Sequence, residues 1–178
     1  MDVAVKRWIG AQELYEDSLR LALMVLDSGF APTLLLGLWR GGSPVAITLH
    51  ETLAYFGVLA EHLPLRTSLY TGIDARAPRL RIHGIEALAV AGFDCRRVLI
   101  VDDVITAGTA VRGVVELIAA AGASIAGVVL GLDRAERGSG TDSAVTELAR
   151  ELGVPVFSIA RLDDIVRFLE ASEDPGEH

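Results

Sequence analysis

VLIVDDVITAGTAV, residues 98–111, is the stretch of sequence that decides the fold. Its first four residues, Val98–Val101, are apolar and mostly β-branched, which predicts a short buried strand. Two carboxylates, Asp102 and Asp103, follow at once, and a loop of small residues, 106–109, then leads into a helical pattern. A strand, a hydroxyl- and glycine-containing turn and a helix start together form an anion cradle, because free N–H groups and the helix dipole converge there. The adjacent acids can bind ribose hydroxyls or a divalent metal carried on a diphosphate.

A second strand–turn–helix pattern precedes this stretch. An apolar run over 33–38 predicts a buried strand, and the turn Trp39-Arg40-Gly41-Gly42-Ser43-Pro44 leads to a helix over 45–56. Gly41 and Gly42 let the main chain approach a ligand closely or adopt a positive φ. An ordinary strand-to-helix turn and a ligand-binding turn both remain open on these residues alone.

The rest of the chain repeats strands and helices in alternation. The helices are expected over 11–28, 111–121, 142–152 and 162–169, and the strands within 58–69 and over 125–132 and 154–159. This order predicts one α/β domain over residues 1–178, with a parallel sheet flanked by helices and an N-terminal helix region over 1–32. Loops that bind ligands gather at the carboxyl edge of such sheets. We therefore expect four groups along one rim: Arg40-Gly41-Gly42, Asp102-Asp103, Thr106–Thr109 and Asp133-Arg134.

Residues 66–84, RTSLYTGIDARAPRLRIHG, break the alternation and are rich in Arg, Gly and Thr. Such a composition suits a hairpin or flap. Its four arginines give it positive charge in an otherwise acidic protein. A solvated hairpin and a lid that closes over a bound diphosphate are both compatible with this segment.

The composition limits the partners and the compartment. A net charge of −8 argues against a nucleic-acid partner, whose phosphates would be repelled. Apolar residues make up 51% of the chain, which suits a sheet covered on both faces or an oligomer interface. The weakly charged run 113–132 is interrupted by Glu116, so no membrane span is expected. A single cysteine, Cys95, excludes an internal disulfide, and residues 1–10 lack a signal-peptide pattern, so we expect a cytoplasmic protein.

The strand, acid pair and small-residue loop of residues 98–111 resemble the signature by which type I phosphoribosyltransferases bind 5-phosphoribosyl 1-diphosphate (PRPP). The resemblance covers about residues 33–169. It implies the Rossmann-like fold of that family with a flexible flap. It also implies transfer of 5-phosphoribose from PRPP to a ring nitrogen of a nucleobase, with release of pyrophosphate and with Mg²⁺ as cofactor.

The resemblance assigns roles to individual residues. Asp102 and Asp103 would hold the ribose hydroxyls, offset the positive charge of an oxocarbenium-like transition state, and hold Mg²⁺ indirectly through PRPP or water. The remaining roles are binding of the 5′-phosphate by Thr106, Ala107, Gly108 and Thr109, orientation of pyrophosphate by Arg40, Gly41 and Gly42, closure of the flap by Ser68 and Tyr70, and binding of the base by Asp133 and Arg134.

The choice of base is divided between the two halves of the chain. LLLGLWRGGSPV with RTSLYTG resembles hypoxanthine-type purine enzymes, whereas the stretch from residue 101 onward resembles orotate phosphoribosyltransferase, in which an arginine at the place of Arg134 pairs with the orotate carboxylate. Purine enzymes commonly have an Asp where Thr106 stands, and the orotate family's flap lysines are absent from 66–84. Because the flap and the WRGG turn lie over the chemistry, we expect a homodimeric salvage enzyme for a 6-oxopurine such as hypoxanthine or guanine. An orotate phosphoribosyltransferase of pyrimidine synthesis and a non-catalytic PRPP-sensing regulator are the alternatives.

Overall fold

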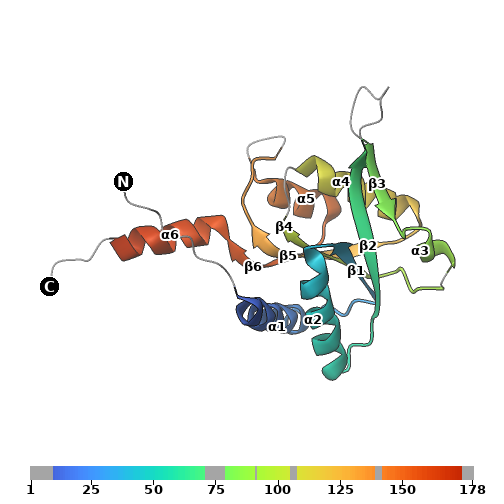
Figure 1. Ribbon diagram of the computed structural model, residues 1–178, viewed down its shortest axis with the longest axis horizontal. Helices are drawn as coiled ribbons and strands as arrows, with labels where there is room; N and C mark the ends of the chain where they lie inside the picture. The colour runs from blue at the N-terminus through green and yellow to red at the C-terminus, as the bar shows by residue number, and fades with distance from the viewer. Residues whose placement is uncertain (1–9, 71–78, 91, 105–107, 139–141, 174–178) are drawn as a thin grey trace.

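The computed structural model describes residues 10–70, 79–90, 92–104, 108–138 and 142–173. Six strands form one sheet in the order β3-β2-β1-β4-β5-β6. All neighbouring strands are parallel except β2 and β3, which form an antiparallel pair. The elements are α1 (Ala11–Asp27), β1 (Leu34–Trp39), α2 (Gly42–Tyr55), β2 (Glu61–Tyr70), β3 (Arg79–His83), α3 (Ala87–Val90), β4 (Val98–Val104), α4 (Gly108–Ala120), β5 (Ile125–Asp133), α5 (Ala144–Leu152), β6 (Val156–Arg161) and α6 (Leu162–Glu173) (Figure 1).

Helices cover both faces of the sheet. Successive residues of a strand point to opposite faces, so the apolar run of β4 contributes Ile100 to one core and Leu99 to the other. The core around Leu99 is closed by α1 and α2, and the core around Ile100 is closed by α3, α4 and α5. The prediction of an α/β sheet flanked by helices is confirmed, and the two cores explain the high apolar fraction of the chain.

Several boundaries differ from those expected from the sequence. β4 continues to Val104, so the two acids lie on the strand rather than after it. α2 begins at Gly42, three residues before the predicted start. The N-cap of α5 is Ser143, whose hydroxyl oxygen accepts the N–H of Thr146 at 3.1 Å, so this helix begins at Ala144 rather than at 142. α6 extends to Glu173 rather than ending at 169.

The segment predicted as a flap forms the two arms of a hairpin. β2 and β3 pair in antiparallel register, with Ser68 opposite Arg81. The residues between the arms, 71–78, lie outside the described residues. The hairpin is therefore confirmed, and its closure over a ligand stays a prediction.

His62 on β2 is a half-buried titratable group. Its Nε2 atom is enclosed and has no hydrogen-bond partner among the described residues, and its ring centroid lies 5.6 Å from that of His50. Burial, and next the charge of His50, lower the pKa of His62 below 6.5. The unfolded chain therefore binds this proton more readily than the folded chain, so its contribution to stability is present above about pH 6.5 and is lost as the pH falls through the lowered pKa.

We expect His62→Leu to reduce the loss of thermal stability between pH 7 and pH 5. Since leucine cannot be protonated, the fall in Tm over this pH interval should be smaller in the variant than in the wild type by about 2 °C. Thermal unfolding followed by circular dichroism measures this difference. His83→Leu, which removes an exposed histidine of β3, is the control and should retain the wild-type slope. If Tm fell equally between pH 7 and pH 5 in the wild type and both variants, the lowered pKa of His62 would be contradicted.

Candidate active site

The glycine turn after β1 packs directly on the acid pair of β4. A Cβ atom on Gly42 would lie 2.7 Å from the Cα atom of Asp102 and still closer to the main-chain oxygen of Val101. A Cβ atom on Gly41 would overlap the carboxylate of Asp103. Only glycines permit this approach, so two segments about 60 residues apart in the sequence form one continuous surface.

The acid pair is held by the main chain that follows it. Asp102 Oδ1 accepts the N–H of Asp103, and Asp103 Oδ1 accepts the N–H of Val104, both at 2.9 Å. Asp102 is half-buried and Asp103 is exposed. Burial, and next the neighbouring carboxyl group of Asp103, raise the pKa of Asp102 to about 7. The pair can thus carry one or two negative charges near neutral pH, depending on what is bound beside it.

The start of α2 faces this pair. Its N-cap residue is Gly41, so no side chain caps the helix. The N–H of Ser43 donates to the Arg40 oxygen at 3.2 Å and Pro44 has no N–H, so Gly42 supplies the amide of this first turn that can meet an anion. Arg40 is exposed beside it, and the peptide bond between Trp39 and Arg40 is cis. A negatively charged group at this turn would meet an arginine and a helix N-terminus together.

The predicted 5′-phosphate loop is described only in part. Thr106 and Ala107 lie outside the described residues, and Gly108 and Thr109 are the first two residues of α4. A strand end and a helix start thus flank a connection of three residues, 105–107. The position of this segment agrees with the expected cradle, and the role of its amides and hydroxyls stays a prediction.

Asp133 and Arg134 lie at the end of β5, the neighbour of β4. A Cβ atom on Gly131 would lie 2.9 Å from the main-chain oxygen of Asp103, so this end of β5 is close to the acid pair. Asp133 is buried, whereas Arg134 is exposed and its guanidinium lies 3.0 Å from Glu136. Arg161, absent from the predicted site, lies 3.5 Å from Asp133 at the end of β6. Its position as the last residue of a strand is the only signal in the sequence that could have found it.

The hairpin rises from the same edge of the sheet. Trp39, the last residue of β1, is in register with Arg66, so Ser68 and Tyr70 continue past the end of β1. The hydroxyl of Ser68 lies 3.3 Å from Nε2 of His83 across the hairpin. The position of the Tyr70 side chain is not described. The hairpin arms therefore stand beside the turn that contains Arg40.

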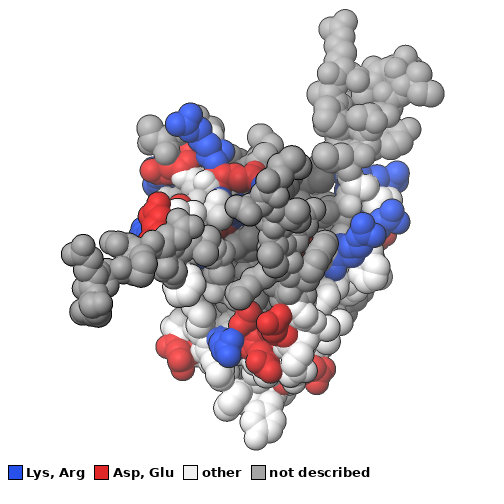
Figure 2. Space-filling model, turned by 60° about the vertical axis from the view of Figure 1, so that its left-hand side comes forward, with Lys and Arg blue, Asp and Glu red and all other residues white. Residues whose placement is uncertain are grey.

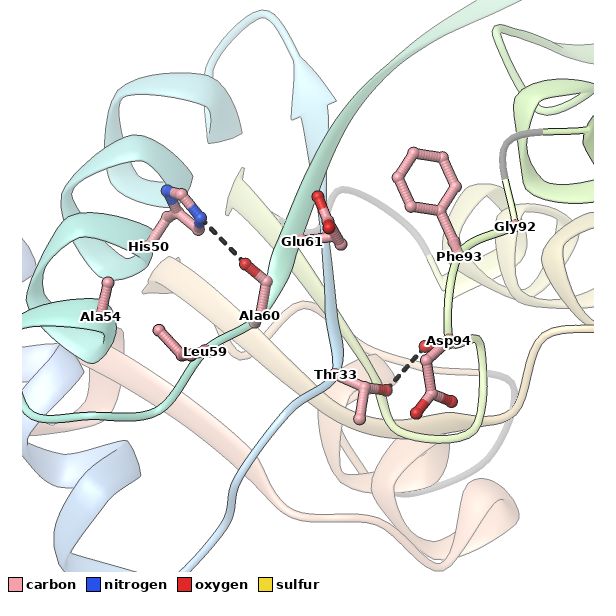
Figure 3. Close-up of a pocket in the computed structure, with 9 residues that line it drawn as sticks. All are labelled: Thr33, His50, Ala54, Leu59, Ala60, Glu61, Gly92, Phe93 and Asp94. Atoms are coloured by element: carbon pink, nitrogen blue, oxygen red, sulfur yellow. Dashed lines mark hydrogen bonds between the residues drawn. The ribbon is translucent and has the colours of Figure 1, made fainter.

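A cavity of about 680 Å³ lies at the opposite edge of the sheet (Figure 3). It is bordered by Thr33, before β1, and by Glu61, the first residue of β2. Two of its polar groups already have partners: His50 Nε2 lies 3.0 Å from the Ala60 oxygen, and the Thr33 hydroxyl donates to the Asp94 oxygen at 2.7 Å. Because parallel strands present their carboxyl ends to ligands, the rim with the acid pair remains the candidate site.

The charges of the described residues bear on possible ligands. On the described part of the face shown in Figure 2, Lys and Arg side chains lie in small groups, some of them next to carboxylates. Among the described residues, no group of three or more His, Cys, Asp or Glu side chains is placed to hold a metal ion. A cation at the rim would therefore depend on ligands from the substrate and water as well as from the acid pair. The described helices include none that is long and apolar enough to cross a membrane.

Comparisons with known proteins agree with this geometry. Residues 10–159 match the family model described as phosphoribosyl transferase domain. Orotate phosphoribosyltransferase of Salmonella agona (strain SL483) is 40% identical over 158 residues, which are 86% of this chain and 68% of that protein. The crystal structure of orotate phosphoribosyltransferase from Francisella tularensis has a TM-score of 0.62 at 22% identity and covers 90% of this chain and 72% of its own. Purine phosphoribosyltransferase from Pyrococcus horikoshii has a TM-score of 0.58 at 20% identity over 86% of each chain. The two solved structures show likeness of fold alone.

Proposed function

Because the chain belongs to the phosphoribosyl transferase family, we propose that the base it joins to 5-phosphoribose is orotate. The reaction would use PRPP and release pyrophosphate and a nucleoside monophosphate. The observation that supports PRPP as the donor is the contact of Gly41 and Gly42 with the acid pair, which would join a pyrophosphate turn to a ribose site. Such a surface suits a substrate in which a diphosphate is attached directly to a ribose.

Catalysis at this rim would rest on positioning and electrostatics. The main-chain N–H of Gly42 at the start of α2 and the guanidinium of Arg40 would orient the leaving pyrophosphate. Asp102 and Asp103 would accept hydrogen bonds from the ribose hydroxyls. Their negative charge would oppose the positive charge that develops on the ribose ring as the glycosidic bond to pyrophosphate breaks. The loop between β4 and α4 would hold the 5′-phosphate.

The residues at the rim fit a magnesium ion held mainly by substrate. Mg²⁺ prefers oxygen ligands, retains several waters and is commonly bound by one or two carboxylates together with phosphates. The exposed carboxylate of Asp103, beside Gly41, supplies such an oxygen where the diphosphate is expected. When bound, the ion would neutralise charge on the pyrophosphate. Asp102 and Asp103 would hold it indirectly, through PRPP or water.

Orotate is now better supported than the 6-oxopurine that the first half of the chain favours. The curated relatives at 40% identity carry the name orotate phosphoribosyltransferase. Arg134 is exposed directly after β5, the strand next to β4, with a guanidinium that can pair with a carboxylate. Orotate has such a carboxylate, and hypoxanthine and guanine do not. The resemblance of the WRGG turn to purine enzymes concerns the pyrophosphate end of the site, which both classes share.

The proposal extends to assembly and location. We propose a homodimer, supported by apolar side chains exposed on α6, among which Phe168 is 70% exposed, and by the extension of this helix away from the sheet in Figure 1. Light scattering of the purified protein tests this, and a monomer at micromolar concentration would refute it. A cytoplasmic location agrees with the single cysteine.

Assays of single bases with PRPP and Mg²⁺ test the substrate. We expect orotate to be used with a kcat/KM at least about 100-fold higher than that of hypoxanthine, guanine, xanthine or uracil, because only orotate offers a carboxylate to Arg134. Release of pyrophosphate is the measured quantity. Turnover of a purine without turnover of orotate would restore the purine salvage function. If PRPP raised the Tm while no base supported pyrophosphate release, a PRPP-sensing regulator would replace both enzymes.

A further inference from the structure

The carboxylate of Asp133 is enclosed at the rim, with 3% of the residue exposed. A buried carboxylate is unfavourable unless hydrogen bonds or a cation compensate it. Asp133 has both. Its Oδ1 atom accepts the N–H of Ala135 at 2.9 Å, and its Oδ2 atom lies 3.5 Å from Nε of Arg161. The two oxygens thus connect a turn after β5 to the end of β6.

The hydrogen bond to Ala135 determines the path of the chain through Arg134. An aspartate that accepts the N–H two residues ahead forms a compact turn. Ala135 has a φ of +50°, a left-handed conformation that an alanine adopts only when its surroundings hold it there. Arg134 lies between the two bonded residues. Its main chain is therefore fixed by the side chain of Asp133.

Arg161 supplies the cation that this arrangement needs. It is the last residue of β6 and is in register with Asp133, so the two side chains start from neighbouring points of the sheet. About half of the Arg161 side chain is exposed. Without its charge, the buried carboxylate would lose its compensating cation and could turn toward water, and the turn would lose its hydrogen-bond acceptor.

The far side of the turn is held as well. The main-chain oxygen of Glu136 accepts the N–H of Ala144, the first residue of α5, at 2.8 Å. Its carboxylate lies 3.0 Å from the guanidinium of Arg134. A carboxylate of the protein thus contacts the guanidinium that is proposed to bind the carboxylate of the base.

We propose that Asp133 and Arg161 are positioning residues that hold Arg134 ready for the carboxylate of orotate, and that Glu136 contacts Arg134 until the substrate carboxylate replaces it. This inference rests on the proposed orotate function. A carboxylate that leaves and a carboxylate that arrives have the same charge and the same geometry. The exchange therefore preserves a paired guanidinium in both states, at a cost in affinity that depends on the strength of the contact with Glu136.

Binding of two product nucleotides tests the role without turnover. Orotidine 5′-monophosphate and uridine 5′-monophosphate share the phosphate and the ribose and differ only in the carboxylate of the base. Isothermal titration calorimetry on the full chain gives the Kd of each. For the wild type we expect the orotidine nucleotide to bind at least about tenfold more tightly than the uridine nucleotide.

Three variants separate positioning from general stability. Arg161→Gln should weaken the orotidine nucleotide about tenfold and leave the uridine nucleotide within twofold, whereas Arg161→Lys should restore most of the affinity because it keeps the charge. Glu136→Gln should strengthen the orotidine nucleotide by a few-fold, because a competing carboxylate is removed. Arg96→Gln is the matched control: it breaks the ion pair with Asp94, which borders the cavity at the opposite edge of the sheet, and should change neither Kd.

The outcomes distinguish this inference from the proposed function. A wild type that binds the two nucleotides equally would overturn the orotate assignment and the inference together. A wild type that prefers the orotidine nucleotide, with Arg161→Gln and Glu136→Gln both unchanged or affecting both nucleotides equally, would overturn the inference alone. If Arg161→Gln fails to fold, the inference is tested with Arg161→Lys and Glu136→Gln, again by comparing the Kd of the orotidine nucleotide with that of the uridine nucleotide.

Discussion

The double variant Asp102→Asn/Asp103→Asn is expected to lose phosphoribosyl transfer while it retains the fold. Both carboxylates lie at the end of β4 against the glycine turn, where the ribose of PRPP is proposed to bind. Amides keep the shape and remove the negative charge that opposes the charge on the ribose ring, so kcat/KM should fall by about 10³ or more. Steady-state release of pyrophosphate measures the loss, and circular dichroism checks the fold. Full activity in the double variant would refute the site.

The single variant Asp102→Asn provides an independent check on the unliganded protein. The pKa of Asp102 is raised from 3.8 to about 7, so between these values the folded chain holds a proton that the unfolded chain has released. That contribution to stability is complete below about pH 3.8 and is lost as the pH rises through about 7. At pH 8 the asparagine variant should therefore be more stable than the wild type, by about 2 kcal/mol once partial exposure is considered. An unchanged or lower Tm at pH 8 would contradict the burial of an ionised Asp102.

Gly42→Ala is expected to be the most damaging single substitution at the rim. The new methyl group would overlap the main chain of β4 at Val101 and Asp102, which is part of the central sheet and cannot move aside. We expect a destabilisation of about 3 kcal/mol and a fall in Tm of about 10 °C. The affinity for PRPP, measured by calorimetry with Mg²⁺, should fall about 100-fold, because the first turn of α2 is displaced from the acid pair.

Two further glycines serve as controls for this substitution. Gly41→Ala meets the side chain of Asp103, which can rotate away, so the variant should fold with a smaller loss of Tm and still bind PRPP weakly. At Gly10, the nearest atom to a new Cβ is 3.4 Å away, an ordinary contact, and Gly10→Ala should change neither quantity. Equal behaviour of Gly42→Ala and Gly10→Ala would show that α2 does not pack on β4 as described.

The sequence was sufficient to locate the acid strand and the two turns beside it. The alternation of apolar runs and helical patterns predicts that Arg40 and Asp102 share one edge, because all parallel strands end on that side. The direct contact of Gly42 with Asp102 could not be predicted, since it depends on β1 and β4 being neighbours in the sheet. The same is true of Arg161 and Asp133, whose contact requires the register of β5 and β6.

The base could not be decided from local patterns for a physical reason. Phosphate and ribose are common to every reaction of this family, so the WRGG turn and the acid pair carry little information about the base. The residue proposed to separate an acidic base from a neutral one is Arg134, and this role depends on the turn and the ion pair that position its side chain. An arginine that follows a strand in the sequence does not by itself indicate which base the protein binds.

The order of the strands separates the residues proposed to bind PRPP from those proposed to bind the base. β1 and β4, at the centre, carry the groups proposed to act on the sugar and its phosphates, whereas β5 and β6, toward one border, carry Arg134 and the pair that supports it. If these roles hold, substitutions on β5 and β6 are expected to alter which base is accepted without changing the binding of PRPP. Redesign or natural selection for a different base would therefore be expected to change residues on β5 and β6 first and to keep those on β1 and β4.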